Sequence, residues 1–205
     1  MTDVELSPTA SRTRRDLVDA AIRCWADDSG ASLTAVARAA GTARTTLNRY
    51  FASRAELVAA VDAECRARFA AAAVRARPDD GDGLAALQRL CAELIGLGPV
   101  LGLVFADNAL VDPDSWDDGD PARADDERDG AGFGSLVLRA QADGSVEPDL
   151  PAEWVATTVW TTLFAAWLCI RGGSATTHEA ASLCARTLAQ GVGGSSRGGV
   201  SAAGR

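Results

Sequence analysis

The chain has 205 residues, of which 47% are hydrophobic and 23% charged, a composition typical of globular and not of disordered proteins. No apolar run reaches the length of a membrane span, and the polar N-terminus excludes a signal peptide, so we expect a cytoplasmic protein. The net charge of −8 is unevenly distributed, with twelve arginines against nine carboxylates in residues 1–77 and eight against nineteen in residues 78–205. A basic region therefore precedes an acidic one, and only the acidic one disfavours nucleic acid as a partner.

Residues 1–10 are predicted to be flexible, and residues 11–77 to form a helical domain that includes a linking helix. A first amphipathic helix ends at the Ser-Gly pair of residues 29–30. A short helix follows and stops at Gly41, where glycine can supply the positive φ that a tight turn often needs. A capping box beginning at Ser53 then starts a long helix. The succession predicts two short helices, joined by a tight turn, between two longer ones.

Residues 78–190 are predicted to form a second helical domain, because the charge changes sign at the Pro- and Asp-rich break near residue 78. Apolar helices are expected on both sides of Pro99, and three more over residues 131–142, 152–171 and 177–190. An acidic loop and a disordered tail are predicted over residues 112–129 and 191–205. No segment favours a strand, so the predicted fold class is all-α.

The stretch from residue 33 to residue 51 has the pattern of a helix-turn-helix. Leu47 and Phe51 are predicted to face the core, which leaves the polar side chains of the second helix facing solvent. Arginine can bind a guanine edge or a phosphate, asparagine can pair with adenine, and threonine can contact a thymine methyl group or a phosphate. We therefore expect the outward side chains to bind double-stranded DNA: Arg44, Thr45, Asn48 and Arg49.

Residues 12–61 resemble the DNA-binding domain of the TetR family of bacterial transcriptional repressors. The shared features are the residues Thr34, Val36-Ala37, Ala40-Gly41, Leu47-Asn-Arg-Tyr-Phe51 and Ser53-Arg-Ala-Glu-Leu57. The resemblance implies an N-terminal three-helix DNA-binding domain, a C-terminal helical ligand-binding and dimerisation domain, and a ligand-responsive repressor that binds a palindromic operator. The residues expected to contact DNA are Thr34, Arg44, Thr45, Thr46, Asn48, Arg49, Tyr50 and Arg54.

Three of these positions depart from the family pattern. Asn48 stands where the family usually has a tyrosine that contacts the DNA backbone, and Tyr50 stands where it usually has a histidine. Arg54 replaces a lysine and keeps the charge that the resemblance assigns to a phosphate contact. The replacements bear on which bases are preferred and leave the expected fold unchanged.

The rest of the chain resembles the family more weakly, through a Gly-centred loop that leads into the apolar helix 152–171. In the family the last two long helices usually pair with their copies in a second subunit, which implies a homodimer. The interface residues expected here are Val155, Val159, Leu163, Leu183, Cys184, Thr187 and Leu188. Aromatic side chains either pack in the core or line a pocket for an unknown small effector, apolar or cationic: Phe105, Trp116, Phe133, Trp160, Phe164 and Trp167.

No catalytic, metal or cofactor site is predicted. His178 is the single histidine, and no Ser-His-Asp or Cys-His arrangement can be argued around it, which weighs against a hydrolytic enzyme. The stretch from Asp125 to Gly130 begins like a calcium loop, but Leu136 stands where the bidentate glutamate belongs. The alternative to a repressor is a small-molecule-binding or sequestering protein of the same fold with weakened DNA binding, for which Asn48 is the support.

Overall fold

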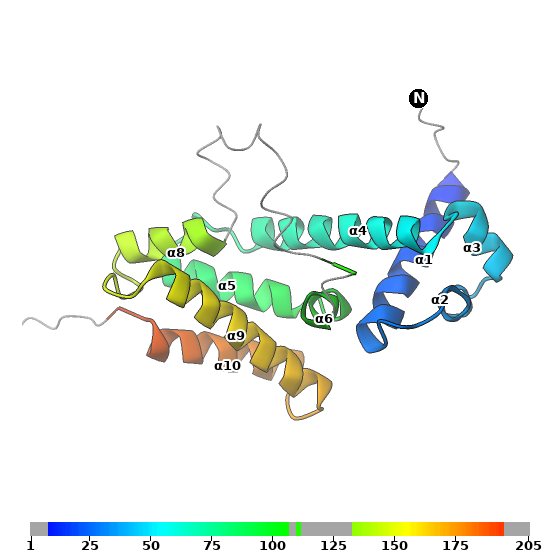
Figure 1. The fold of residues 1–205 in the computed structure, drawn as a ribbon. Helices are drawn as coiled ribbons and strands as arrows, with labels where there is room; N and C mark the ends of the chain where they lie inside the picture. The colour runs from blue at the N-terminus through cyan, green and yellow to red at the C-terminus, as the bar shows by residue number, and fades with distance from the viewer. Residues whose placement is uncertain (1–7, 107–109, 112–132, 195–205) are drawn as a thin grey trace, which may run out of the picture. The chain divides into compact units, whose positions relative to one another are not determined.

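The computed structural model describes residues 8–106, 110–111 and 133–194. Their regular structure is helical apart from an isolated antiparallel bridge between Val146 and Gly193, which confirms the all-α prediction (Figure 1). The acidic stretch 112–129 and most of the predicted tail lie outside the described residues.

The described residues form two compact units. The first lies within the ranges 1–71 and 97–124, and the second within 72–96 and 125–205. The structure thus divides inside a long helix, a few residues before the boundary expected near residue 78. It also assigns the helix after Pro99 to the first unit, because that helix packs against the first helix of the chain.

Five helices lie wholly or mostly in the first unit: α1 (Pro8–Asp27), α2 (Leu33–Ala39), α3 (Arg44–Tyr50), α4 (Arg54–Arg75) and α6 (Pro99–Ala106). α1 begins at Pro8, within residues 1–10, which were expected to be flexible. Proline is tolerated at this position because the first turn of a helix does not need its missing N–H. The core of the unit contains apolar side chains of α1, α2, α3 and α4, among them Leu17, Trp25, Val36, Leu47 and Leu57.

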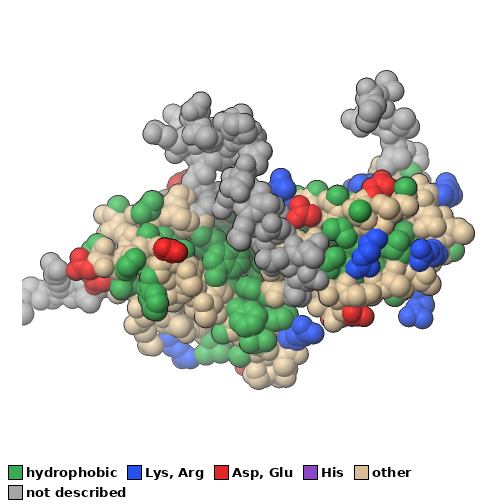
Figure 2. All heavy atoms as spheres, viewed as in Figure 1, with side chains coloured by type: hydrophobic (Ala, Val, Ile, Leu, Met, Phe, Trp, Pro, Cys, Tyr) green, Lys and Arg blue, Asp and Glu red, His purple; other side chains and the backbone are tan. Residues whose placement is uncertain are grey.

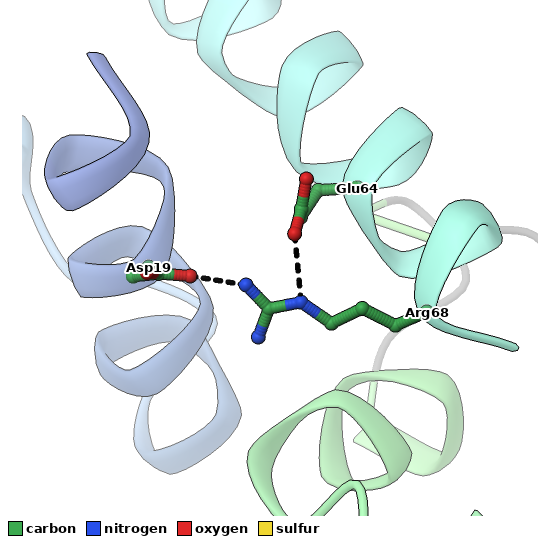
Figure 3. A network of polar contacts seen from close by, with 3 residues as sticks. All are labelled: Asp19, Glu64 and Arg68. Carbon is green, nitrogen blue, oxygen red and sulfur yellow. Dashed lines mark hydrogen bonds and ion pairs between the residues drawn. The ribbon is translucent and has the colours of Figure 1, made fainter. Parts of the chain in front are cut away.

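An arginine ties α4 to α1 within the first unit. The Arg68 guanidinium donates to the Asp19 carboxylate on α1 and, from Nε, to the Glu64 carboxylate on α4 at 2.8 Å (Figure 3). The three side chains are partly buried, so the ion pairs are better protected from water and salt than an exposed pair. Partial burial lowers the pKa of Arg68, but the hydrogen bonds that its guanidinium donates to the two carboxylates outweigh this effect and raise the pKa.

Four helices form the second unit: α5 (Gly83–Ile95), α8 (Phe133–Ala142), α9 (Ala152–Arg171) and α10 (Thr177–Gly191). α5 packs against the other three, and α9 packs against α8 and α10. A Cβ at Gly83 would lie 2.3 Å from Ala140 Cα, so glycine is needed where α5 crosses α8. Thr176 and Glu179 form a complete capping box that starts α10.

α9 is long and apolar enough to cross a membrane when it is judged by length and composition alone. Core helices of globular proteins pass the same test. Here the stripe formed by Val155, Val159, Leu163 and Ala166 is buried against neighbouring helices of the second unit. We therefore treat α9 as a packed helix of this unit.

Candidate functional site

The turn between α2 and α3 has the geometry that the sequence predicts. Gly41 has a φ of +68°, in the left-handed region that favours glycine. Its N–H donates to Arg38 O at 3.0 Å, and the N–H of Thr42 donates to Ala37 O at 2.9 Å. These two bonds are a Schellman motif, which ends α2 and reverses the chain into α3.

α3 buries one face and exposes the other, as predicted. Leu47 is fully buried, and so is Phe51, which directly follows the helix. Thr45, Asn48 and Arg49 are exposed, while Thr46 and Tyr50 are partly buried at the sides. With Arg44, which is also exposed, the outward side chains offer hydrogen-bond donors and acceptors and two positive charges. Such a face suits base edges and phosphates better than it suits an apolar partner.

Two of the expected DNA contacts lie next to each other at the starts of α2 and α3. Arg44 Nη1 donates a hydrogen bond to Thr34 Oγ1 at 3.1 Å, and both side chains are exposed. The bond links residues ten positions apart and restricts the freedom of the guanidinium. We call the exposed side chains of Thr34, Arg44, Thr45, Asn48 and Arg49 the α2–α3 surface. Figure 2 shows several basic side chains at the surface of the first unit, at the right of the view.

Arg54 lies differently from its expected place. Its Nη1 donates to Ala31 O at 2.7 Å and its Nη2 to Ser29 O at 2.6 Å. Its guanidinium also stacks over the Trp25 ring, with Cζ 4.6 Å from the ring centroid. The side chain is part-buried and bound to the protein's own backbone, an arrangement that competes with its expected role as a phosphate contact.

Four of the six aromatic side chains expected near an effector lie in the second unit, in two pairs. The ring centroids of Phe133 on α8 and Trp160 on α9 are 4.9 Å apart. Those of Phe164 and Trp167, both on α9, are 5.5 Å apart. Phe105 belongs to α6 in the first unit, and Trp116 lies outside the described residues.

The aromatic side chains of α9 follow one another at spacings of four and three, which places Trp160, Phe164 and Trp167 on one stripe. Arg171 continues the stripe by one more turn, and its Cζ lies 5.2 Å from the Trp167 ring centroid. The face of Trp167 thus already accommodates a cation, through the negative potential of its ring. We call Phe133, Trp160, Phe164 and Trp167 the aromatic cluster.

The structure corrects most of the expected interface residues. Five of the seven are buried within the second unit itself, namely Val155, Val159, Leu163, Cys184 and Leu188. They have no surface to offer a second subunit, because α5, α8 and α10 already cover that side of α9 and α5 and α9 cover α10. Leu183 and Thr187 remain exposed on α10, and Leu183 has 43% of its surface accessible.

Other large apolar side chains are exposed on α9. Trp154 is 63% exposed and Leu168 is 47% exposed. Neither residue was expected at an interface, because a pattern apolar on all sides does not tell which side the rest of the chain covers. Figure 2 shows hydrophobic side chains at the surface over α9.

Three of the five cysteines are buried, as expected for structural thiols. Burial raises the pKa of Cys65 to about 12. Cys91 on α5 and Cys184 on α10 form a hydrogen bond, which together with burial holds the pKa of Cys91 well above its ordinary value. Cys65 and Cys91 therefore stay protonated and are poor nucleophiles.

The chain is similar to known bacterial regulators along most of its length. The family model of "bacterial regulatory proteins, tetR family" matches residues 17–61. The HTH-type transcriptional repressor LfrR of Mycolicibacterium smegmatis is 30% identical over 171 residues, which cover 82% of this chain and 84% of the relative.

Solved structures show the same similarity. The crystal structure of the TetR-like regulator LfrR from Mycobacterium smegmatis in complex with proflavine is 28% identical, with a TM-score of 0.66. The match covers 90% of this chain and 98% of that one. A TetR family regulator from Marinobacter aquaeolei VT8 has a TM-score of 0.68 at 21% identity, over 92% of this chain and 100% of the other, and shows the common fold.

Proposed function

The chain belongs to the TetR family of bacterial transcriptional regulators, and from this premise we propose that it is a repressor released from its operator by a planar aromatic cation. Members of this family are DNA-binding regulators and not enzymes. We place its action in the cytoplasm, where the operator is. The observation that carries the proposal is the outer face of α3, which is polar while its inner face is fully buried.

The α2–α3 surface supports operator binding in chemistry and in position. Arg44 is held by Thr34 at the start of α3, while Asn48 and Arg49 extend the exposed polar face along the same helix. In a helix-turn-helix the second helix enters the major groove, where arginine and asparagine can bind guanine and adenine through paired hydrogen bonds. A helix of seven residues covers few base pairs, so specificity requires a second copy.

Exposed apolar side chains support a homodimer through α9 and α10. Trp154 and Leu168 on α9 and Leu183 on α10 are large, apolar and between 43% and 63% exposed. Covering them with the same surface of a second copy removes apolar area from water, and a two-fold symmetric contact uses each side chain twice. Such a dimer presents two α3 helices to a palindromic operator.

The aromatic cluster supports an effector with a flat, positively charged ring system. Proflavine, which is bound in the related LfrR structure, has this chemistry. Rings of Phe133, Trp160, Phe164 and Trp167 offer faces on which such a molecule can stack. Among the described residues no charged side chain is fully buried, and we propose cation–π attraction and stacking as the main interactions with the ligand.

Fluorescence anisotropy with labelled DNA from upstream of the protein's own gene tests the proposal. We expect saturable, salt-sensitive binding that proflavine reverses. Because proflavine also intercalates into DNA, its binding to the protein alone must be measured by isothermal titration calorimetry. A Trp160→Leu variant separates the two routes: intercalation releases wild type and variant equally, whereas a protein site requires more ligand for the variant. Absence of binding to any upstream fragment contradicts the repressor function.

A further inference from the structure

We infer that Arg54 is a positioning residue that ties the start of α4 to the loop between α1 and α2 and thereby orients the α2–α3 surface. The loop runs from the end of α1 at Asp27 to the start of α2 at Leu33. Arg54 lies more than twenty residues further along the chain, yet its two terminal nitrogens bind two carbonyls of this loop. The inference rests on the proposed DNA binding of the α2–α3 surface.

The loop carries short-range bonds of its own, which fix its shape. Asp28 accepts a hydrogen bond from the N–H of Gly30 at 2.9 Å, and the N–H of Ala31 donates to Asp28 O at 2.9 Å. Neither bond connects the loop to the rest of the unit. At its start the loop is joined to α1 by the N–H of Asp28, which donates to Cys24 O at 2.9 Å. Further along, the connection comes from Arg54 and from Trp25, whose indole N–H donates to Ala31 O at 3.0 Å.

The tie requires an arginine. Its planar guanidinium presents parallel N–H donors, so it can bind Ser29 O and Ala31 O together while its flat face lies on the Trp25 ring. Trp25 is fully buried and held by its own hydrogen bond, so the ring is a fixed platform. A lysine has the same charge but a compact ammonium group on a flexible stem, and it cannot reproduce this fork and stack.

The position of this loop determines the position of α2. Ser32 follows Ala31 directly and is the N-cap of α2, where its hydroxyl accepts a hydrogen bond from the N–H of Ala35 at 3.2 Å. α2 has only seven residues and leads through the Schellman turn at Gly41 into α3. Thr34 on α2 holds Arg44 on α3, so a shift of the loop displaces residues on both helices.

The competing role for Arg54 is a direct phosphate contact, and substitutions separate the two. A phosphate contact depends on the positive charge, so Arg54→Lys would preserve it, and Arg54→Gln would reduce the slope of log K against log salt by about 0.9. A positioning role depends on the forked geometry of the guanidinium, so both variants should impair operator binding. The slope of log K against log salt should then change no more than it does in a variant that loses a charge far from the DNA. Arg66→Gln is the matched control, because Arg66 is an exposed arginine of the same helix that pairs with Asp62.

The experiment measures the affinity of the wild type and the three variants for operator and for nonspecific DNA over a range of salt concentrations, well below their unfolding temperatures. We expect Arg54→Lys and Arg54→Gln to bind operator about tenfold more weakly, as for loss of one charge-assisted hydrogen bond. In nonspecific affinity and in salt slope, Arg54→Lys should match the wild type and Arg54→Gln should match Arg66→Gln, because the two proteins of each pair have the same net charge. The ratio of operator to nonspecific affinity therefore falls, which a simple loss of folded protein cannot produce.

Hydrogen exchange of the Ala35 and Val36 amides tests the tie without DNA. Both amides are bound to Ser32 at the start of α2, and we expect them to exchange about tenfold faster in Arg54→Lys and unchanged in Arg66→Gln. If Arg54→Lys behaves as wild type in exchange and in operator binding, the inference is wrong. If the wild type binds no operator but the exchange difference appears, the proposed function fails and the tie stands.

Discussion

α3 and α9 each bury one stripe of apolar side chains and differ in what they expose. α3 buries Leu47 and presents Asn48 and Arg49 to solvent. α9 buries Val159 and its neighbours and presents large apolar side chains, including Leu168. The inner faces are alike because folding of the monomer removes both from water. The outer faces stay in solvent, so folding of the monomer does not determine whether they are polar or apolar.

The outer face is therefore the better indicator of a partner. Polar and positively charged groups on a short helix of the basic region 1–77 are well hydrated in the free protein and can bind the anionic DNA duplex. Large exposed apolar groups on a long helix gain most from a second apolar surface. This difference predicts that substitutions on the outer face of α9 change assembly, whereas those on the outer face of α3 change DNA binding alone.

The largest effect is expected from an arginine in the proposed dimer interface. Leu183→Arg places an unpaired charge opposite its symmetry mate, and we expect dimerisation to weaken by several kcal/mol, on the order of 3 or more. Leu183 is 43% exposed in the monomer, so the variant should still fold. Analytical ultracentrifugation should show a monomer, and operator binding should be lost with the second α3.

Leu138→Arg is the control for this variant. Leu138 is also an exposed leucine of the second unit, but it lies on α8, whereas the residues proposed for the interface lie on α9 and α10. We expect Leu138→Arg to remain dimeric and to bind DNA. A Leu183→Arg protein that is folded, dimeric and bound to operator removes α10 from the interface.

Adjacent residues of α3 provide the next contrast. Leu47→Ala leaves a cavity under the helix and should lower the free energy of unfolding by about 2–5 kcal/mol. Asn48→Ala removes an exposed side chain and should leave stability within about 0.5 kcal/mol of wild type, while operator binding weakens by about 1–3 kcal/mol. Both variants should be measured by thermal denaturation and by anisotropy. The loss of stability in Leu47→Ala should appear in denaturation, and the loss of operator affinity in Asn48→Ala should appear in anisotropy. Equal losses of stability would place Asn48 inside the core.

The sequence predicts the parts of the fold that depend on local chemistry. The positive φ of Gly41, the inward direction of Leu47 and the start of α4 after Ser53 all follow from residues within a few positions. The capping box at Ser53 differs in one detail. Ser53 Oγ accepts from the N–H of Glu56, but the Glu56 carboxylate accepts from the N–H of Ala52, one residue earlier than the usual partner.

The sequence could not predict contacts between distant segments. An arginine in Arg54's position is equally suited to a phosphate and to a carbonyl, and only the fold brings Ser29 and Ala31 within its reach. Periodicity likewise shows that Val155 is buried but not whether its own unit or a second copy covers it. For this reason the expected interface residues lay on the covered stripe of α9, whereas the interface that we propose uses the exposed side chains of the helix.

A smaller effect is expected within the α2–α3 surface. Arg44→Ala should weaken operator binding by about 1–3 kcal/mol if the guanidinium binds a guanine edge. Thr34→Val keeps the shape of the side chain but removes the acceptor that holds Arg44, so it should cause a smaller loss of the same kind. Anisotropy against operators with single base changes should show relaxed specificity at one position for both variants. Loss spread evenly over all positions would assign Arg44 to a phosphate instead.

The smallest effect concerns Arg171, which distinguishes the aromatic stripe of α9 from its other exposed side chains. Its guanidinium lies over the Trp167 ring, where it competes with a cationic ligand for the ring face and repels it. Arg171→Gln should therefore bind proflavine more tightly, by about 0.5–1 kcal/mol, whereas Trp167→Leu should bind it more weakly by a similar amount. Arg186→Gln on α10 removes the same charge elsewhere in the unit and controls for net charge. Calorimetry of the three variants measures these changes in proflavine affinity. Tighter binding by Arg186→Gln as well would show that the effect comes from overall charge. No change in either Arg171→Gln or Trp167→Leu would place the ligand away from this end of α9.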